Sequence, residues 1–204
     1  MKNISIAIVT ALLFVGCNKP AQEQDNSHAH GDHDGDDMKD AKEVMDEGAT
    51  TTISKKAMAQ LDAKSGSNLT GTVTFTEEGG KVKMEVEVSN VAPGVHAIHL
   101  HEKGDCSSDD GKSAGGHWNP TEEPHGEWGH GEFHMGDIGN LEISEDGKGT
   151  LSFETDKWAI GGDDAKKDII GKAVIIHAKA DDMKSQPSGA AGDRIGCGVI
   201  QLEN

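Results

Sequence analysis

Residues 81–88 read KVKMEVEV, and polar and apolar side chains alternate through this run without interruption. Successive side chains of a β-strand point to opposite faces of the sheet, so the run predicts a strand with one buried and one solvated face. A similar run, TVTFT at 72–76, precedes it, and the turn-forming sequence EEGG at 77–80 lies between them. The two runs therefore predict an antiparallel hairpin.

Period-two alternation begins near residue 51 and recurs along the chain. Further short strands are predicted at 141–143, 150–153, 173–178 and 197–202. The first two flank DGKG at 146–149 and are predicted to form a second hairpin. The chain has 27 glycines, which suit numerous tight turns. Many short strands between such turns predict an all-β domain, an antiparallel β-sandwich or barrel of about eight strands.

The stretch 103–139 is rich in glycine and histidine but has no strand pattern. A loop of this length in a compact domain is usually functional or disordered. The strand before it carries His99 and His101, which share one face at this spacing and can converge on one ion. His96 has the opposite parity and is expected to face the other side.

The long loop itself contains donors suited to a metal. These are His117, His125, His130, His134 and Asp137. Three imidazoles and one carboxylate suit a tetrahedral zinc site, and loop ligands can fold around an ion. A further histidine, His177, ends the predicted strand at 173–178. The alternative interpretation is that these histidines are polar surface residues of a solvated loop.

The amino terminus has the pattern of an export signal. Residues 4–15 are apolar but too few to span a bilayer as a helix. The sequence FVGC at 14–17 resembles the lipobox of bacterial lipoproteins, with Phe14 in place of the usual leucine. This resemblance implies cleavage before Cys17 and lipidation of that cysteine. The alternative is an ordinary secretory signal that leaves a free cysteine.

Residues 17–52 are expected to form a polar, acidic tether. Between residues 18 and 47 the chain has ten acidic residues and three lysines. The tract SHAHGDHDGDD contains His28, His30 and His33, and His/Asp-rich tracts bind divalent ions. The tether is therefore a solvated spacer, an auxiliary metal-collecting tract, or both. The boundaries predict a signal peptide at 1–16, a lipidated tether at 17–52 and one domain at 53–204.

Charge and cysteine content narrow the function classes. The formal net charge is −17, which excludes nucleic acid as a natural partner because the phosphates would be repelled. If Cys17 carries lipid, Cys106 and Cys197 remain as a single pair, and an oxidising compartment would join them.

Six segments together resemble the copper/zinc superoxide dismutase family, of the bacterial exported kind. They are HAIHLH at 96–101, SAGGHWNP at 113–120, HMGDIGN at 134–140, IIGK at 169–172, HAKADD at 177–182 and GDRIGCGVI at 192–200. They follow the family's order and spacing over about residues 54–204. The resemblance implies a Greek-key β-barrel with long metal-binding loops. It also implies copper and zinc as cofactors and superoxide as substrate.

The resemblance also implies a role for each matching residue. The copper ligands would be His99, His101, His117 and His177. The zinc ligands would be His117, His125, His134 and Asp137, so that His117 bridges both metals. Other implied roles are a Cys106–Cys197 disulfide, an anion-binding Arg194 above the copper, an Asp181 that links a copper histidine to a zinc histidine, and a structural His96. His130 has no matching role and would be an exposed loop residue or an auxiliary ligand.

The expected function is dismutation of superoxide to oxygen and hydrogen peroxide. The alternative is a lipoprotein that stores or delivers copper and zinc; a weaker one is a structural surface protein. The complete ligand set and Arg194 favour the enzyme, because a metal store needs no anion-binding arginine. Lys184, in the short loop at 181–194, is a candidate for steering the substrate, because a cation near the site would attract an anion. Lipid on Cys17 would attach the protein to a bacterial membrane, facing the periplasm or the cell surface, and the sequence leaves a homodimer open.

Overall fold

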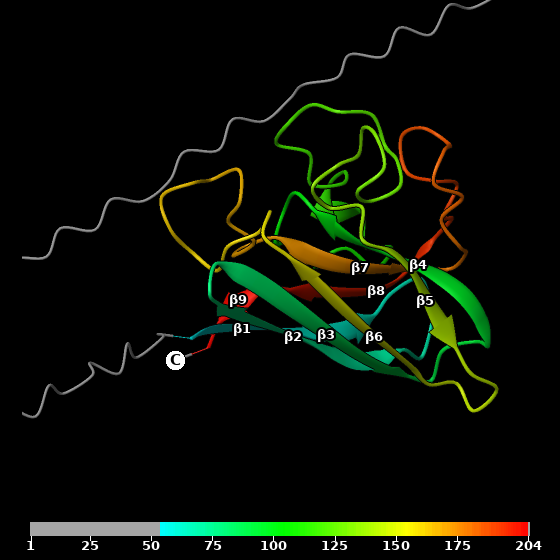
Figure 1. The fold of residues 1–204 in the computed structure, drawn as a ribbon. Coiled ribbons are helices and arrows are strands. Elements are labelled where there is room, and N and C mark those ends of the chain that lie inside the picture. Colours follow the sequence, from blue (N-terminus) through cyan, green and yellow to red (C-terminus); the bar gives the residue numbers. More distant parts are fainter. Residues whose placement is uncertain (1–53, 204) are drawn as a thin grey trace, which may run out of the picture. The chain divides into compact units, whose positions relative to one another are not determined.

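The computed structural model describes residues 54–203, which fold into an all-β unit (Figure 1). The expected signal peptide, Cys17 and the tether with His28, His30 and His33 lie outside the described residues. The strands are β1 (Lys55–Ala63), β2 (Thr70–Glu78), β3 (Lys81–Ser89), β4 (Gly94–His101), β5 (Gly139–Ile143), β6 (Gly149–Thr155), β7 (Ala173–His177), β8 (Arg194–Val199) and β9 (Gln201–Leu202). In the described part of the chain, no helix has the length and apolar content that a membrane span requires.

The strands form a nearly closed antiparallel barrel. Their order is β5-β4-β7-β8-β1-β2-β3-β6, and the short β9 pairs with β1 beside this path. The predicted hairpin is present as β2 and β3, which pair in register from Thr70↔Ser89 to Glu78↔Lys81. The predicted fold class is confirmed, with β4 and β7 adjacent in space although the chain between them makes β5 and β6.

The expected second hairpin is wrong in its pairing. β5 pairs with β4, and β6 pairs with β3, so these two strands lie at opposite ends of the strand order. The turn at 144–148 does form, and the Ser144 N–H donates to the Lys148 carbonyl at 2.9 Å. It joins the two ends of the sheet and so helps to close the barrel, which local sequence could not indicate.

The predicted strand at 197–202 begins earlier and is interrupted. It starts at Arg194 as β8 and breaks at Ile200, where β9 follows. The Ile200 N–H donates to the Lys172 carbonyl at 2.9 Å, and its carbonyl accepts from the Gly171 N–H at 3.0 Å. These bonds turn Ile200 toward the 171–172 turn. β8 pairs with both β7 and β1, whereas β9 beyond the break pairs with β1.

The barrel interior is built from the apolar face of each strand. In β3 the alternation predicted from sequence is observed, with Val82, Met84, Val86 and Val88 buried and the residues between them exposed. Each such side chain contributes about 1.5–3 kcal/mol on burial. β7 is buried on both faces, since Val174 and Ile176 join the interior while Ala173 and Ile175 pack outside it with Ala114 and Cys197.

The outer face of β4 is also covered, and the candidate site lies on this face. Ile98 and Leu100 face the interior core, whereas the alternating His99 and His101 point to the outer face and are also buried. The outer face is covered by the long connections β4–β5 and β7–β8 (Figure 1). The first connection, residues 102–138, contains the short 3-10 helix Lys112–Ala114 and an isolated β-bridge between His117 and His101 of β4.

Candidate metal centre

Two groups of metal-ligating side chains meet on this covered face. One contains His99, His101, His117 and His177, and the other contains His117, His125, His134 and Asp137. In each group, one ligand atom per residue lies within 4.8 Å of all the others. His117 belongs to both groups, and its ring centroid lies 4.0 Å from that of His99 and 5.4 Å from that of His134. The structure thus brings together the seven residues that the resemblance implied as copper and zinc ligands.

Three backbone segments that hydrogen-bond to one another bring these side chains together. The Trp118 N–H donates to the Leu100 carbonyl at 2.8 Å, the Leu100 N–H to the Gly136 carbonyl at 2.9 Å, and the Gly136 N–H to the Trp118 carbonyl at 2.9 Å. Leu100 lies between the two β4 histidines, Trp118 follows His117, and Gly136 lies between His134 and Asp137. The approach requires glycine at 136, since a Cβ there would collide with the Leu100 carbonyl oxygen.

The ring nitrogens of the predicted ligands fit bound metal ions. Among the described residues, the buried side-chain nitrogens and oxygens without a hydrogen-bond partner are His99 Nδ1, His101 Nε2, His117 Nε2, His125 Nδ1 and His177 Nε2. All five belong to the two groups. A buried polar atom without a partner is costly, so each needs a ligand. A metal ion in each group would satisfy them all.

The second group converges on a single carboxylate oxygen. Asp137 Oδ1 is within hydrogen-bond reach of His117 Nδ1 at 2.8 Å and of His134 Nδ1 at 3.1 Å. His125 Nδ1 also lies 3.1 Å from this oxygen, but not in hydrogen-bond geometry. Burial alone would raise the pKa of Asp137, but its contacts with these three histidines outweigh burial and hold the pKa well below its usual range. Three nitrogens and one carboxylate oxygen in this arrangement fit tetrahedral zinc.

The first group consists of imidazoles alone, and burial favours the neutral form of three of them. Burial lowers the pKa of His117 to about 4 and that of His177 to about 3. Burial likewise lowers the pKa of His101 well below its ordinary value. Neutral imidazole is the form that binds a metal, and four imidazoles suit copper.

Asp181 connects the two groups through the far sides of their rings. Its Oδ2 lies 2.7 Å from His99 Nε2, and its Oδ1 lies 3.0 Å from His125 Nε2. These two hydrogen bonds fix the tautomers of both rings, so that His99 and His125 each present Nδ1 to the metal position. Asn140 holds this carboxylate segment in turn, since its side chain accepts from the Asp181 N–H at 2.8 Å and donates to the Asp181 carbonyl at 3.0 Å. The sequence predicted no separate role for Asn140, which is part of the matching segment 134–140.

Arg194 lies beside the first group because β7 and β8 pair His177 with Arg194. Its Nη1 donates to the Gly111 carbonyl and its Nη2 to the Gly115 carbonyl, both at 2.8 Å. The Gly115 carbonyl also lies 2.9 Å from His101 Nδ1. One backbone oxygen therefore connects the arginine to a predicted copper ligand, and the guanidinium is held in a fixed orientation.

The remaining predicted residues have distinct positions. His96 is buried, with Nδ1 2.8 Å from the His177 carbonyl and Nε2 2.9 Å from the Ala92 carbonyl. His130 is exposed, belongs to neither group, and lies 3.6 Å from a Glu127 oxygen. Lys184 is exposed in the β7–β8 connection.

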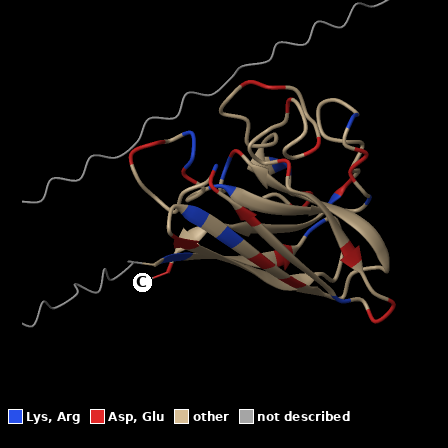
Figure 2. Ribbon diagram, in the orientation of Figure 1, with Lys and Arg blue, Asp and Glu red and all other residues tan. Residues whose placement is uncertain are grey.

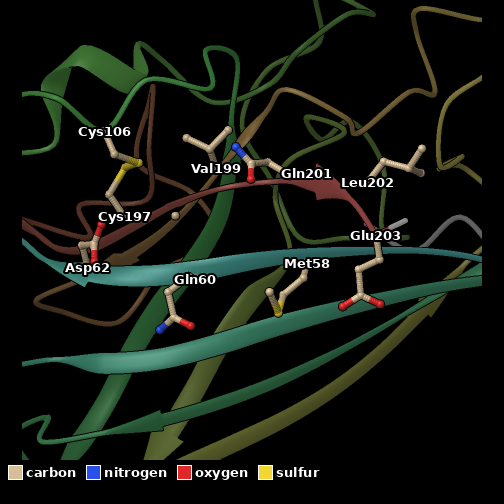
Figure 3. Close-up of a pocket in the computed structure, with 10 residues that line it drawn as sticks. Met58, Gln60, Asp62, Cys106, Cys197, Val199, Gln201, Leu202 and Glu203 are labelled. Carbon is tan, nitrogen blue, oxygen red and sulfur yellow. A yellow bond between two sulfur atoms is a disulfide. The ribbon is translucent and has the colours of Figure 1, made fainter.

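The predicted disulfide is present and fastens the loop that carries His117 to β8. It joins Cys106 to Cys197, with a Cα–Cα distance of 5.8 Å. Figure 3 shows this bond at the wall of a surface hollow whose lining includes Met58 and Gln60 of β1 and no histidine. The hollow is therefore separate from the metal-ligand groups.

Known proteins resemble this chain over the same part. The family described as copper/zinc superoxide dismutase (SODC) matches residues 69–200. The Cu-Zn superoxide dismutase of Caulobacter vibrioides is 38% identical over 135 residues, covering 64% of this chain and 78% of the relative. That of Deinococcus radiodurans is 34% identical over 147 residues, covering 67% and 79%.

Two further proteins resemble the chain. The extracellular Cu-Zn superoxide dismutase of Caenorhabditis elegans is 38% identical over 138 residues, which cover 65% of this chain and 61% of the relative. The crystal structure of the clock protein EA4 superposes with a TM-score of 0.65 at 34% identity, covering 78% of this chain and all of EA4. With the family match spanning more than half of its residues, the chain belongs to the copper/zinc superoxide dismutase family.

Proposed function

We propose that this protein dismutates superoxide to oxygen and hydrogen peroxide at a copper ion joined to a structural zinc through His117. Copper would be held by His99, His101, His117 and His177, and zinc by His117, His125, His134 and Asp137. The observation that carries the proposal is the set of five buried ring nitrogens without partners, all of which face these two positions. When bound, copper would supply a one-electron redox couple, and zinc would hold the shared imidazole.

Arg194 would bind the anionic substrate beside the copper ligands. Its guanidinium has five N–H donors, and the Gly111 and Gly115 carbonyls use one donor each, which leaves donors for an anion. Residues 54–203 contain 26 acidic and 15 basic residues, which are interspersed over the fold (Figure 2). Charges beyond about 8 Å are largely screened at physiological salt, so a cation next to the site matters more than this overall balance. Lys184 would be a second cation for steering.

His117 would hold and deliver one of the two protons that the reduction of superoxide to hydrogen peroxide requires, and the second would come from solvent. Its Nδ1 faces Asp137 and His134, whereas its Nε2 is buried without a hydrogen-bond partner. A proton held at Nε2 would therefore lie on the side of the first group, next to Arg194 and the substrate. Asp137 would keep the ring in place through Nδ1 while the proton moves.

Metal analysis combined with a superoxide decay assay tests this function. The wild-type protein is expected to bind one copper and one zinc and to accelerate superoxide decay, and His99→Ala is expected to lose copper and activity. His130→Ala is a matched control, because His130 is exposed and outside both groups. A fully metallated wild-type protein without activity would favour the metal-storage alternative instead.

We further propose that the protein is exported and anchored by lipid on Cys17, with residues 17–52 as a tether and His28, His30 and His33 as an auxiliary metal tract. The disulfide and the extracellular relative support export. Mass spectrometry of the mature amino terminus would test for lipid on Cys17. The Cys17→Ser variant should lack the lipid and be released from membranes.

A further inference from the structure

The side chain of Gln186 bonds both peptide groups of His125. Gln186 Oε1 accepts from the His125 N–H at 2.9 Å, and Gln186 Nε2 donates to the His125 carbonyl at 2.8 Å. The two residues are 61 positions apart in the chain, and Gln186 comes from the β7–β8 connection. A side-chain amide here completes a two-bond ring with the backbone of a predicted zinc ligand.

This ring fixes the direction of the His125 side chain. The N–H of His125 belongs to the peptide plane before its Cα, and the carbonyl belongs to the plane after it. One rigid amide that bonds both groups therefore restricts both soft dihedrals of the residue. These dihedrals set the direction of the Cα–Cβ bond, so the clamp orients the side chain toward the metal position.

The neighbouring contacts act on the same histidine from other sides. Asp181 Oδ1 lies 3.0 Å from His125 Nε2, and the Gly126 N–H donates to Asp137 Oδ2 at 3.1 Å. Asp181 and Gln186 belong to one short segment, so the β7–β8 connection contacts both the ring and the backbone of His125. The ligand is thus held between this segment and the carboxylate that shares its metal position.

The segment that carries Gln186 is itself anchored to the barrel. Asn140 of β5 forms two hydrogen bonds with the Asp181 backbone. The Ser185 N–H donates to Asp182 Oδ1 at 2.8 Å, and the Asp182 N–H donates to the Gly189 carbonyl at 3.0 Å. Gln186 therefore contacts His125 from a locally folded turn, although much of its own surface is exposed.

We propose that Gln186 is a positioning residue for zinc, and that its clamp on His125 couples zinc binding to the order of segment 181–189. This inference rests on the proposed zinc site. Partners that orient a metal ligand commonly change metal affinity 10–100-fold when they are removed. The coupling is reciprocal in free energy: the ordered segment strengthens zinc binding, and bound zinc stabilises the ordered segment by the same amount.

Zinc release from the Gln186→Met variant tests the clamp. Methionine has a similar length but forms neither hydrogen bond. The full chain is loaded with one equivalent each of copper and zinc, and zinc transfer to 4-(2-pyridylazo)resorcinol is followed at constant pH. We expect an affinity loss of about tenfold that appears in the dissociation rate, so that release is about tenfold faster than in the wild type. With cobalt in the zinc position, the visible absorption bands are expected to shift, because they report the ligand geometry.

Gln60→Met is the matched control. Gln60 also donates from Nε2 to a backbone carbonyl, that of Gly71, at 2.7 Å, but it lies on β1 beside the hollow of Figure 3. Its variant is expected to release zinc at the wild-type rate and to keep the cobalt spectrum. Equal acceleration in both glutamine variants would overturn the proposal, because it would indicate a general loss of stability.

A second variant keeps the proposal testable if Gln186→Met does not fold. Gln186→Glu retains an acceptor for the His125 N–H and places an oxygen against the His125 carbonyl. Faster zinc release and faster hydrogen exchange over residues 181–189 are expected in the zinc-bound variant, while the wild type is protected there. Release within twofold of the wild type in either folded variant overturns the role of Gln186.

Failure of the proposed function would give a different result. If the wild type retains no zinc, or if His125→Ala leaves zinc release unchanged, the zinc-site assignment is wrong and the inference fails with it. If the wild type binds zinc through His125 but Gln186→Met releases it at the wild-type rate, only the role of Gln186 is wrong.

Discussion

Replacing Cys106 by Ser and Cys197 by Ala removes a covalent bond between residues 91 positions apart. In the chain-entropy model, opening a loop of this size costs roughly 4–5 kcal/mol of stability, because the unfolded chain regains conformations that the bond had excluded. Cys197 is fully buried beside Ala114, Ala173 and Ile175, so alanine is the substitution that leaves no buried polar group there. This loss is a large fraction of the free energy of unfolding of a typical domain, which is roughly 5–15 kcal/mol.

Urea denaturation of the metal-free proteins measures this cost. Metals must be removed from both proteins, since an ion that binds only the folded state adds to its apparent stability. With a urea m value of about 2 kcal/mol/M, the transition midpoint is expected to fall by about 2 M. The m value is also expected to rise, because an unfolded chain without the bond exposes more surface.

Reduction of the wild type provides the control. Wild-type protein treated with reductant is expected to unfold at nearly the same urea concentration as the double variant, and the variant should not respond to reductant. A loss below about 2 kcal/mol in a variant with an unchanged circular dichroism spectrum would refute the loop-entropy reasoning. In that case the disulfide would mainly fix the loop before His117, and its removal would affect metal affinity rather than stability.

Three further predictions follow from the site and its surroundings. Arg194→Ala should lower activity at low salt and flatten its dependence on ionic strength, as measured by superoxide decay between low and physiological salt; an unchanged salt slope would remove Arg194 from substrate steering. Trp158→Phe should destabilise the metal-free protein by about 1–3 kcal/mol in urea denaturation, since it leaves the Met135 carbonyl, which now accepts from Trp158 Nε1 at 2.9 Å, without its partner. Deleting residues 18–47 should preserve turnover of the loaded enzyme but slow copper and zinc uptake when metal is scarce; equal uptake rates would leave that segment as a spacer.

Sequence patterns were sufficient for several of the strands and for the ligand pair on β4. The alternation at 81–88 predicted which side chains of β3 are buried, because the two faces of a strand are set by local geometry. The spacing of His99 and His101 likewise placed both on one face. The family resemblance then indicated which loop residues to group with them, and the structure brings those residues together.

Tertiary structure decided the features that depend on distant partners. Sequence next to the turn at 144–148 resembles a hairpin, but β5 and β6 pair with β4 and β3 because barrel closure offers each of them a longer-range partner. The clamp of Gln186 on His125 had no sequence signal, since a glutamine in a polar loop is ordinarily a solvated residue. Local periodicity determines which face of a strand is buried, whereas the contacts that aim a ligand depend on how segments 61 residues apart pack together.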